Sequence, residues 1–144
     1  MIGIINYGLG NLLAFKNSFK ILGKPSKILN HPLEVEKCSH LILPGVGSFD
    51  FAIECLQNSK IFKSVEKAVL EEKKPVLGVC SGMQIMFEKS EEGIKNGLGW
   101  IDGEVVKFSD DILEKDNLPT PHIGWNKVHQ SSLNKIFTGD IEDE

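Results

Sequence analysis

The segment PVLGVCSGMQ, residues 75–84, contains the pattern that decides the fold. Its apolar run at 76–80 predicts a buried strand, and the spacing that follows predicts a helix from about Gly82 to Glu88. A buried strand that leads directly into a helix is typical of an α/β protein with a parallel sheet. The order Gly-x-Cys-x-Gly at this turn is the pattern of a nucleophile elbow, in which small neighbours let the backbone bend and expose the reactive atom.

The same alternation of strand and helix extends toward the N-terminus. Apolar runs predict strands at residues 2–5, 26–29 and 40–43. Apolar spacings of three and four predict helices at residues 11–22, 51–56 and 61–70. Asn11 is expected to cap the first helix and Gly23 to end it. Together these elements predict a doubly wound, mostly parallel sheet.

After Gly97 the pattern changes. The pattern predicts strands at residues 100–108 and 127–130, with no clear helix between them. We therefore expect an antiparallel extension of the sheet. No internal repeat or low-complexity tract divides the chain, and we expect one domain over residues 1–144.

The composition is that of an ordinary soluble protein. The 144 residues are 41% hydrophobic and 25% charged, with a net charge of −4, which argues against a nucleic-acid partner. No apolar run approaches the roughly 20 residues of a membrane span, and the N-terminus lacks the pattern of a signal peptide. Three irregularly spaced cysteines make no disulfide framework, so we expect a cytoplasmic protein. No Cys–His cluster has the spacing of metal ligands, and we expect no metal and no cofactor.

Three glycine-rich loops follow predicted strands, at residues 7–11, 44–49 and 78–84. Parallel strands end at one edge of the sheet, where ligands of open α/β folds bind, so we expect these loops to converge. The first loop lacks the third glycine of a dinucleotide-binding motif, because Leu13 stands at that position.

Cys80 is the candidate nucleophile. A helix N-terminus favours the thiolate, and the backbone amide of Ser81 can donate to an oxyanion. The alternative reading is a small buried cysteine in a glycine-bordered turn. Cys38 and Cys55 have no such context, and we expect them in the core or on a helix face.

The loop from Gly45 to Gly47 is a candidate oxyanion loop, because its backbone amides are little obstructed by side chains. The alternative is a connection that needs glycine for a positive φ. The general base is left open, since spacing singles out none of the four histidines, which are His31, His40, His122 and His129.

Five motifs carry a resemblance to a known family, in its order and at its spacings, from residue 1 to about residue 137. They are NYGLGNL at 6–12, PGVGSF at 44–49, GVCSGMQ at 78–84, GLGW at 97–100 and PHIGWN at 121–126. The chain resembles the glutaminase subunit of imidazole glycerol phosphate synthase, a class I (triad) glutamine amidotransferase of histidine biosynthesis. Ser81 is a small departure, because the family commonly carries Leu there.

The resemblance implies a flavodoxin-like glutaminase fold and a set of roles. Cys80 would form a thioester with glutamine and release ammonia. The oxyanion would be held by residues of two loops, which are Gly45, Val46, Gly47 and Ser81. Gln84, with Gly47, would hold the glutamine substrate. Ammonia would pass to a (β/α)8-barrel cyclase subunit in a heterodimer, with Asn11 and Trp125 near that partner.

The resemblance also implies a triad completed by a histidine and a glutamate two residues apart, in members that run to about 200 residues. The sequence contains no His-x-Glu and stops at Glu144, so we expect a glutaminase domain that is incomplete at its C-terminus. Three alternatives stay open: a shortened docking protein without catalysis, an ammonia supplier to a surface-sugar amidotransferase, and a different cysteine hydrolase on the same scaffold.

Overall fold

The computed structural model describes residues 1–115, 121 and 123–125. Backbone contacts divide the chain into two units, Met1–Lys107 and Phe108–Glu144, and each is described by itself. The second unit contributes one described helix, α6 (Asp110–Lys115). The single domain expected over residues 1–144 stays a prediction.

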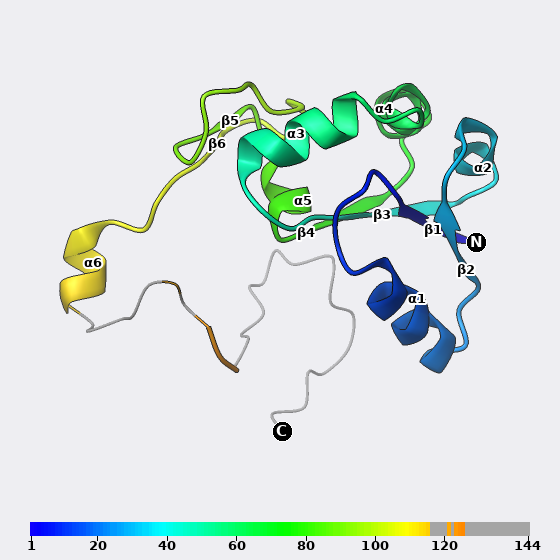
Figure 1. The fold of residues 1–144 in the computed structure, drawn as a ribbon, viewed down its shortest axis with the longest axis horizontal. Helices are drawn as coiled ribbons and strands as arrows, with labels where there is room; N and C mark the ends of the chain where they lie inside the picture. The colour runs from blue at the N-terminus through cyan, green and yellow to red at the C-terminus, as the bar shows by residue number, and fades with distance from the viewer. Residues whose placement is uncertain (116–120, 122, 126–144) are drawn as a thin grey trace. The chain divides into compact units, whose positions relative to one another are not determined.

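Four parallel strands form the central sheet of the first unit (Figure 1). They are β1 (Ile2–Ile5), β2 (Ser26–Leu29), β3 (His40–Pro44) and β4 (Val76–Val79). Their order is β2-β1-β3-β4, and all three pairings are parallel. The strands lie where the apolar runs predict them, so the parallel sheet is confirmed.

Helices cover both faces of this sheet. They are α1 (Leu12–Ile21), α2 (Pro32–Glu36), α3 (Phe49–Gln57), α4 (Phe62–Leu70) and α5 (Ser81–Gln84). Helix α1 lies on one face, and α3, α4 and α5 lie on the other (Figure 1). Helix α2, which the sequence pattern did not predict, packs against α4. The doubly wound fold is therefore confirmed.

The strand order determines where a ligand can bind. The chain leaves β1 toward β2 through α1, and then returns past β1 to β3 through α2. The connections after β1 and β3 therefore run in opposite directions. In open α/β sheets the crevice at the carboxyl ends of such strands is the usual ligand site.

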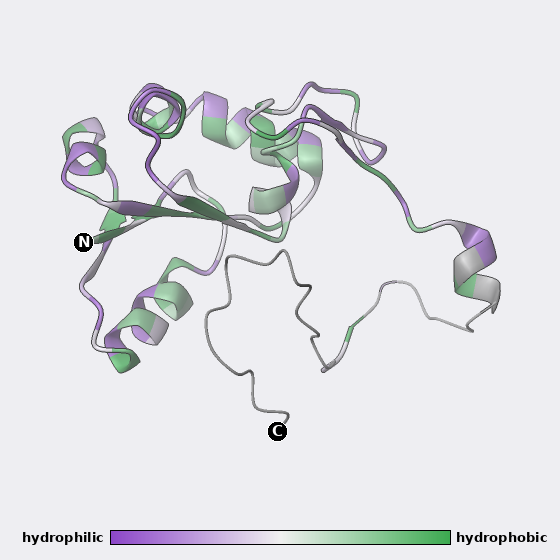
Figure 2. Cartoon of the chain, turned by 180° about the vertical axis from the view of Figure 1, so that it is seen from behind, coloured by the Kyte–Doolittle hydropathy of each residue, from purple (hydrophilic) through white to green (hydrophobic). Residues whose placement is uncertain are grey.

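The main core lies between the sheet and the helices α3 and α4. Figure 2 shows green, hydrophobic residues both along the strands and in these helices. Its fully buried members include Leu41 and Leu43 from β3, and Phe49, Ile53 and Leu56 from α3. Helix α1 is different, because none of its residues is buried. The apolar stripe predicted for α1 is half-buried at Leu12, Phe15 and Phe19, whereas Leu22 is 65% exposed.

Over residues 100–108 the expected antiparallel extension is wrong. In residues 100–108 only β6 (Glu104–Val105) forms a strand, and it pairs in parallel with β5 (Lys89–Ser90) in a separate sheet. The reason is that the backbone before β6 is already bonded elsewhere: Trp100 N and Ile101 N both donate to Met86 O, at 2.8 and 3.0 Å. The other predicted strand, at residues 127–130, lies outside the described residues.

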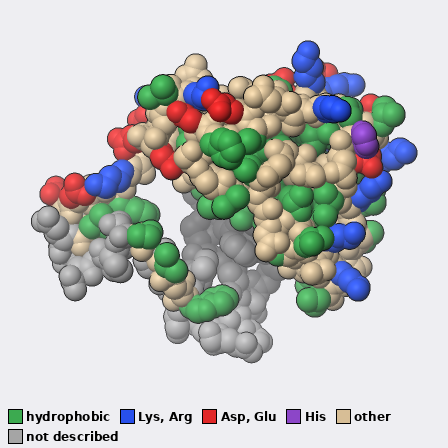
Figure 3. Space-filling view, viewed as in Figure 1, with side chains coloured by type: hydrophobic (Ala, Val, Ile, Leu, Met, Phe, Trp, Pro, Cys, Tyr) green, Lys and Arg blue, Asp and Glu red, His purple; other side chains and the backbone are tan. Residues whose placement is uncertain are grey.

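Charge is unevenly spread over the visible face of the first unit (Figure 3). Acidic side chains gather over the β5–β6 region, and lysines lie along the side that carries α1 and β2. No helix in the described part of the chain is long and apolar enough to cross a membrane.

Candidate active site

Cys80 stands at a sharp turn between β4 and α5. It is the N-cap of α5, with φ 56° and ψ −129°, a conformation that costs a non-glycine residue on the order of 1–3 kcal/mol. Its carbonyl oxygen accepts from Met83 N at 2.9 Å and Gln84 N at 3.1 Å, which holds the turn closed. The Cys80 side chain is exposed. A strained backbone that presents an accessible thiol is the geometry of a nucleophile elbow.

The loop after β3 is pressed against this elbow. A Cβ atom placed on Gly45 would lie 2.0 Å from Gly82 N and 2.4 Å from Ser81 Oγ. A Cβ atom placed on Gly82 would lie 2.1 Å from Leu43 O. These spaces exclude any side chain, so glycine at both positions is what allows the loop from Gly45 to Gly47 to lie beside Cys80.

Tyr7 ties the first glycine-rich loop to the same place. Its buried hydroxyl donates to Pro44 O at 2.5 Å, immediately before the candidate oxyanion loop. Burial, with smaller contributions from Cys55 and Cys80, raises the pKa of Tyr7 above its usual value. The phenol therefore keeps its proton and remains a donor. Sequence reasoning missed this role, although Tyr7 lies within a loop that it expected at the site.

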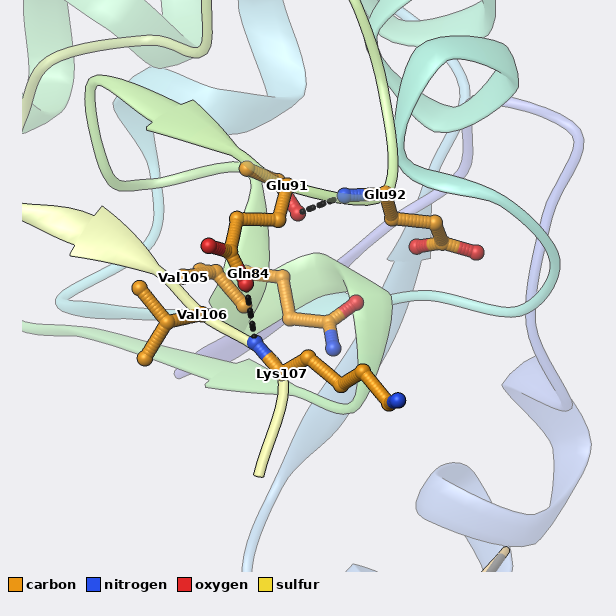
Figure 4. A pocket seen from close by; sticks show the side chains of 7 residues that line it. Gln84, Glu91, Glu92, Val105, Val106 and Lys107 are labelled. Carbon is orange, nitrogen blue, oxygen red and sulfur yellow. Dashed lines mark hydrogen bonds between the residues drawn. The ribbon is translucent and has the colours of Figure 1, made fainter. Parts of the chain in front are cut away.

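Gln84 lines a pocket of about 510 Å³ in the acidic region of the first unit (Figure 4). The pocket is also lined by Ser90, Glu91, Glu92, Val105, Val106 and Lys107. The backbone of Lys107 donates to Glu91 Oε2 at 2.6 Å, and Glu92 N donates to Ser90 Oγ at 3.2 Å. No sequence pattern singled out the two glutamates, because their chain segment meets Gln84 only in the folded structure.

Hydrogen bonds from two carboxylates connect the segment that forms this pocket to the start of α3. Glu92 Oε2 accepts from Phe49 N at 3.2 Å, and Asp50 Oδ1 accepts from Ile94 N at 3.1 Å and from Lys95 N at 3.0 Å. Phe49 begins α3, two residues after Gly47. The pocket wall and the candidate oxyanion loop are thus held by the same helix end.

Helix α5 is shorter than expected. It ends at Gln84 and not near Glu88. The amides that would continue it bond differently, because Met86 N donates only three residues back, to Met83 O at 3.1 Å. Glu88 N donates to a distant residue, to Gly103 O at 3.1 Å. Fewer aligned peptide groups give a smaller helix dipole, so the support for an anionic sulfur from this source is smaller than the sequence predicts.

The other two cysteines are placed as expected. Cys38 is buried in the core, and its burial raises the pKa of its thiol. Cys55 is partly buried on α3 and packs against the core. Neither has the exposed elbow geometry of Cys80.

Two of the four histidines lie in the described part of the chain, and neither of them is near Cys80. His40 begins β3 and lies at the amino edge of the sheet, opposite the edge that carries Cys80. His31 caps α2 after β2, which is separated from β4 by two strands, or roughly 14 Å at the usual strand spacing. His122 and His129 lie outside the described residues.

The candidate partner residues are both on the surface. Asn11 is exposed and caps α1, where its Oδ1 accepts from Ala14 N at 3.1 Å. Trp125, in the second unit, is fully exposed. Within the described residues, no group of three His, Cys, Asp or Glu side chains could hold a metal ion.

Comparison with known proteins bears on the fold and the family of the chain. Residues 3–115 match the CobB/CobQ-like glutamine amidotransferase domain. A crystal structure of a glutamine amidotransferase is similar in fold, with a TM-score of 0.53 and 24% identity, over 62% of this chain and 47% of that one.

Three curated relatives bear the name imidazole glycerol phosphate synthase subunit HisH. The Leptospira interrogans protein is 47% identical over 137 residues, which are 95% of this chain and 67% of the relative. The HisH 1 protein of Campylobacter jejuni (strain RM1221) is 42% identical, over 96% of this chain and 68% of the relative. The Bacillus licheniformis protein is 43% identical, over 92% of this chain and 63% of the relative. The chain therefore spans about two thirds of the length of these relatives, and it belongs to the glutamine amidotransferase family, within its group of HisH subunits.

Proposed function

We propose that this chain is the glutaminase subunit of an imidazole glycerol phosphate synthase and hydrolyses glutamine to glutamate and ammonia in histidine biosynthesis. The observation that carries the proposal is the strained, exposed Cys80 with Gly45 packed on the next two residues, in a chain of the HisH group.

Cys80 is the nucleophile of this reaction. Its sulfur, as thiolate, attacks the side-chain carbonyl carbon of glutamine and forms a tetrahedral oxyanion. The C–N bond then breaks as the general base, which has taken the thiol proton, gives it to the amide nitrogen; the nitrogen leaves as ammonia, and a thioester remains. Water attacks the thioester, the C–S bond breaks, and glutamate is released. The thiol proton passes to a general base, which the family resemblance gives as a histidine oriented by a glutamate two residues later.

The oxyanion is stabilised by backbone amides from two loops. The Ser81 amide follows the nucleophile directly, and the amides of Val46 and Gly47 belong to the loop that contacts it. Gly47 has φ 90°, and Val46 is 54% exposed, so this loop keeps its amides free of core packing. Removing one such donor costs about 10²–10³ in rate in enzymes of this chemistry.

The pocket next to Gln84 suits an amino acid. The Gln84 amide can bond polar groups of the substrate, and the carboxylates of Glu91 and Glu92 favour a cationic group such as an α-ammonium. The pocket lies next to the elbow along the chain, because the backbone amide of Gln84 donates to Cys80 O, but Cys80 itself does not line it.

The ammonia acceptor in this proposal is a (β/α)8-barrel cyclase subunit that forms a heterodimer with the chain. The relatives are named as subunits, which supports a partner chain. The exposed Asn11 and Trp125 are the residues that we expect at the interface, since an exposed tryptophan suits an interface anchor.

The test is glutamate release by the chain together with a barrel cyclase subunit. We expect Cys80→Ser to abolish hydrolysis and to leave partner binding intact, whereas the matched change Cys55→Ser leaves hydrolysis unchanged. Ammonia release that survives Cys80→Ser would overturn the assignment. Partner binding without any hydrolysis by the unmodified chain would show a docking protein. Ammonia release coupled only to a sugar amidotransferase would show a different acceptor.

A further inference from the structure

Asp50 binds a turn of the chain that is distant from it in sequence. Its Oδ1 accepts from Ile94 N at 3.1 Å and from Lys95 N at 3.0 Å. Glycine at position 93 leaves room for the carboxylate, because a Cβ atom on Gly93 would lie 2.8 Å from Asp50 Cγ. Consecutive backbone amides that point at one anion form a nest, and here the anion is a side chain in the first turn of α3. The turn at residues 93–95 is therefore held on α3.

The residue just before this turn is Glu92, which lines the pocket together with Gln84 (Figure 4). Its Oε2 accepts from Phe49 N at 3.2 Å, and its backbone amide donates to Ser90 Oγ at 3.2 Å. Ser48, the N-cap of α3, makes no side-chain capping bond, so the Glu92 carboxylate satisfies one of the free amides at this helix end. A carboxylate has about four lone-pair sites, so Glu92 can still accept from a cation in the pocket.

The position of Glu92 depends mainly on the bonds that Asp50 makes. The bond between Glu92 and Phe49 N is longer than the usual N–H···O distance of about 2.9–3.0 Å, so it holds the side chain weakly. Lys95 pairs with Glu54 at 2.9 Å, but both side chains are exposed, and an exposed ion pair contributes little. The two amides bound by Asp50 are the stronger link between the turn and α3.

We propose that Asp50 is a positioning residue that sets the affinity for L-glutamine, because it holds the turn at 93–95 and so directs Glu92 toward the α-ammonium group of the substrate. Asp50 is not among the residues that line the pocket, so it acts through Glu92. Its effect is confined to one charged group, since the carboxamide that reacts with Cys80 is at the other end of glutamine. The inference rests on the proposed glutaminase function and adds a residue to it.

The test compares two ligands on the full chain in complex with the partner subunit. Glutaramate is glutamine without the α-ammonium group, so its binding does not depend on Glu92. In Asp50→Ala, the KM for L-glutamine should rise about ten-fold with kcat unchanged, as expected for the partial loss of one charged hydrogen bond in binding. In the Cys80→Ser background, Asp50→Ala should raise the Kd of L-glutamine by a similar factor and leave the Kd of glutaramate unchanged.

Two further variants separate positioning from folding. Asp50→Asn keeps the Oδ1 acceptor of both amides and loses only Oδ2, which also accepts from Ile94 N at 3.1 Å, so it should restore most of the affinity. Glu54→Ala is the matched control, because it removes a carboxylate of the same helix that pairs with the Lys95 side chain at the same turn. It should leave KM and both Kd values unchanged.

Each outcome decides one of the two proposals. An unchanged KM and Kd for L-glutamine in Asp50→Ala would overturn the inference, and so would a Cys80→Ser protein that does not bind L-glutamine. An equal rise in the Kd of glutaramate would overturn it as well, because Asp50 would then hold the shape of the whole pocket. A fall in kcat with unchanged KM would assign Asp50 to the reacting centre instead. Hydrolysis that is equal in the parent and in Cys80→Ser would refute the glutaminase function, and the two Kd values would still decide the role of Asp50.

Discussion

Gly45→Ala is the change that tests the active-site geometry most directly. The added Cβ would lie 2.0 Å from Gly82 N, 2.4 Å from Ser81 Oγ and 2.7 Å from the Ser81 carbonyl carbon. Two of these three atoms belong to the backbone of the elbow, so no side-chain rotation relieves the clash. The loop and the elbow must move apart.

The size of this movement follows from the contact distances. The shortest gap must widen from 2.0 Å to the 3.4 Å of an ordinary contact. A displacement of about 1 Å at a reacting centre can cost about 10²-fold in rate. We therefore expect kcat for glutamine hydrolysis to fall about 100-fold, and the free energy of unfolding to fall by about 1–3 kcal/mol, as in other overpacked sites.

The assay compares Gly45→Ala with Gly23→Ala. Gly23 also adopts a positive φ, of 64°, but a Cβ there would meet no atom within 4 Å. Gly23→Ala should lower stability through its backbone alone and leave kcat unchanged, because it lies at the far end of α1. If Gly45→Ala kept both the kcat and the stability of the parent chain, Gly45 would not be pressed on the elbow and the reasoning would fail.

Three further predictions follow from other contacts. Tyr7→Phe leaves the buried Pro44 carbonyl unpaired, so urea unfolding should show a loss of about 1–3 kcal/mol; no loss would contradict the bond. Asp50→Ala removes the acceptor of two amides in the loop after β5, so hydrogen exchange there should speed up, and unchanged exchange would show that the carboxylate does not hold the loop. An ion pair with Lys27 and two backbone amides lower the pKa of Glu34 from 4.5 to about 2, so its stabilisation is present above pH 4.5 and lost as the pH falls toward 2. Glu34→Gln should flatten the melting temperature across that range, and an unchanged curve would refute this link.

The sheet could be predicted from the sequence because its signals are local. The runs at 2–5, 41–43 and 76–79 are apolar without interruption, as strands covered on both faces must be. Glycine and proline mark the turns after them. The order of the strands then follows from the way short helical connections pack on a parallel sheet.

The end of α5 could not be predicted because its cause is distant in sequence. Residues 85–88 have a helical pattern of side chains, but Glu88 N donates to Gly103 O, and the carbonyls of residues 85–88 bond to amides of residues 97–101. The same bonds shorten the strand expected over 100–108. No residue between 85 and 88 signals this competition, so a local pattern gives the wrong length for both elements.

The residues of the site fall into the same two groups, those with a local sequence signal and those without one. Cys80 and Gly45 were identifiable because steric crowding leaves a glycine pattern in the sequence. The sequence did not identify Tyr7, Glu91 and Glu92. Their roles as an anchor or a pocket wall depend on contacts with residues that are distant in the chain. The Asp50 carboxylate is a further case, because only the packed structure shows that it accepts from Ile94 N and Lys95 N.

The short α5 changes how the chemistry at Cys80 must be understood. A single helical turn contributes few aligned dipoles, so the elbow mainly exposes the thiol and places it beside amide donors. Those donors act on the oxyanion, which forms only after the sulfur has attacked. Formation of the thiolate is a separate step that calls for a general base, and the two described histidines lie across the sheet or at its opposite edge. A change at Gly45 should therefore lower kcat without moving the acidic limb of its pH profile. A shift of that limb in Gly45→Ala would show that the loop also controls the proton, and would contradict this separation of roles.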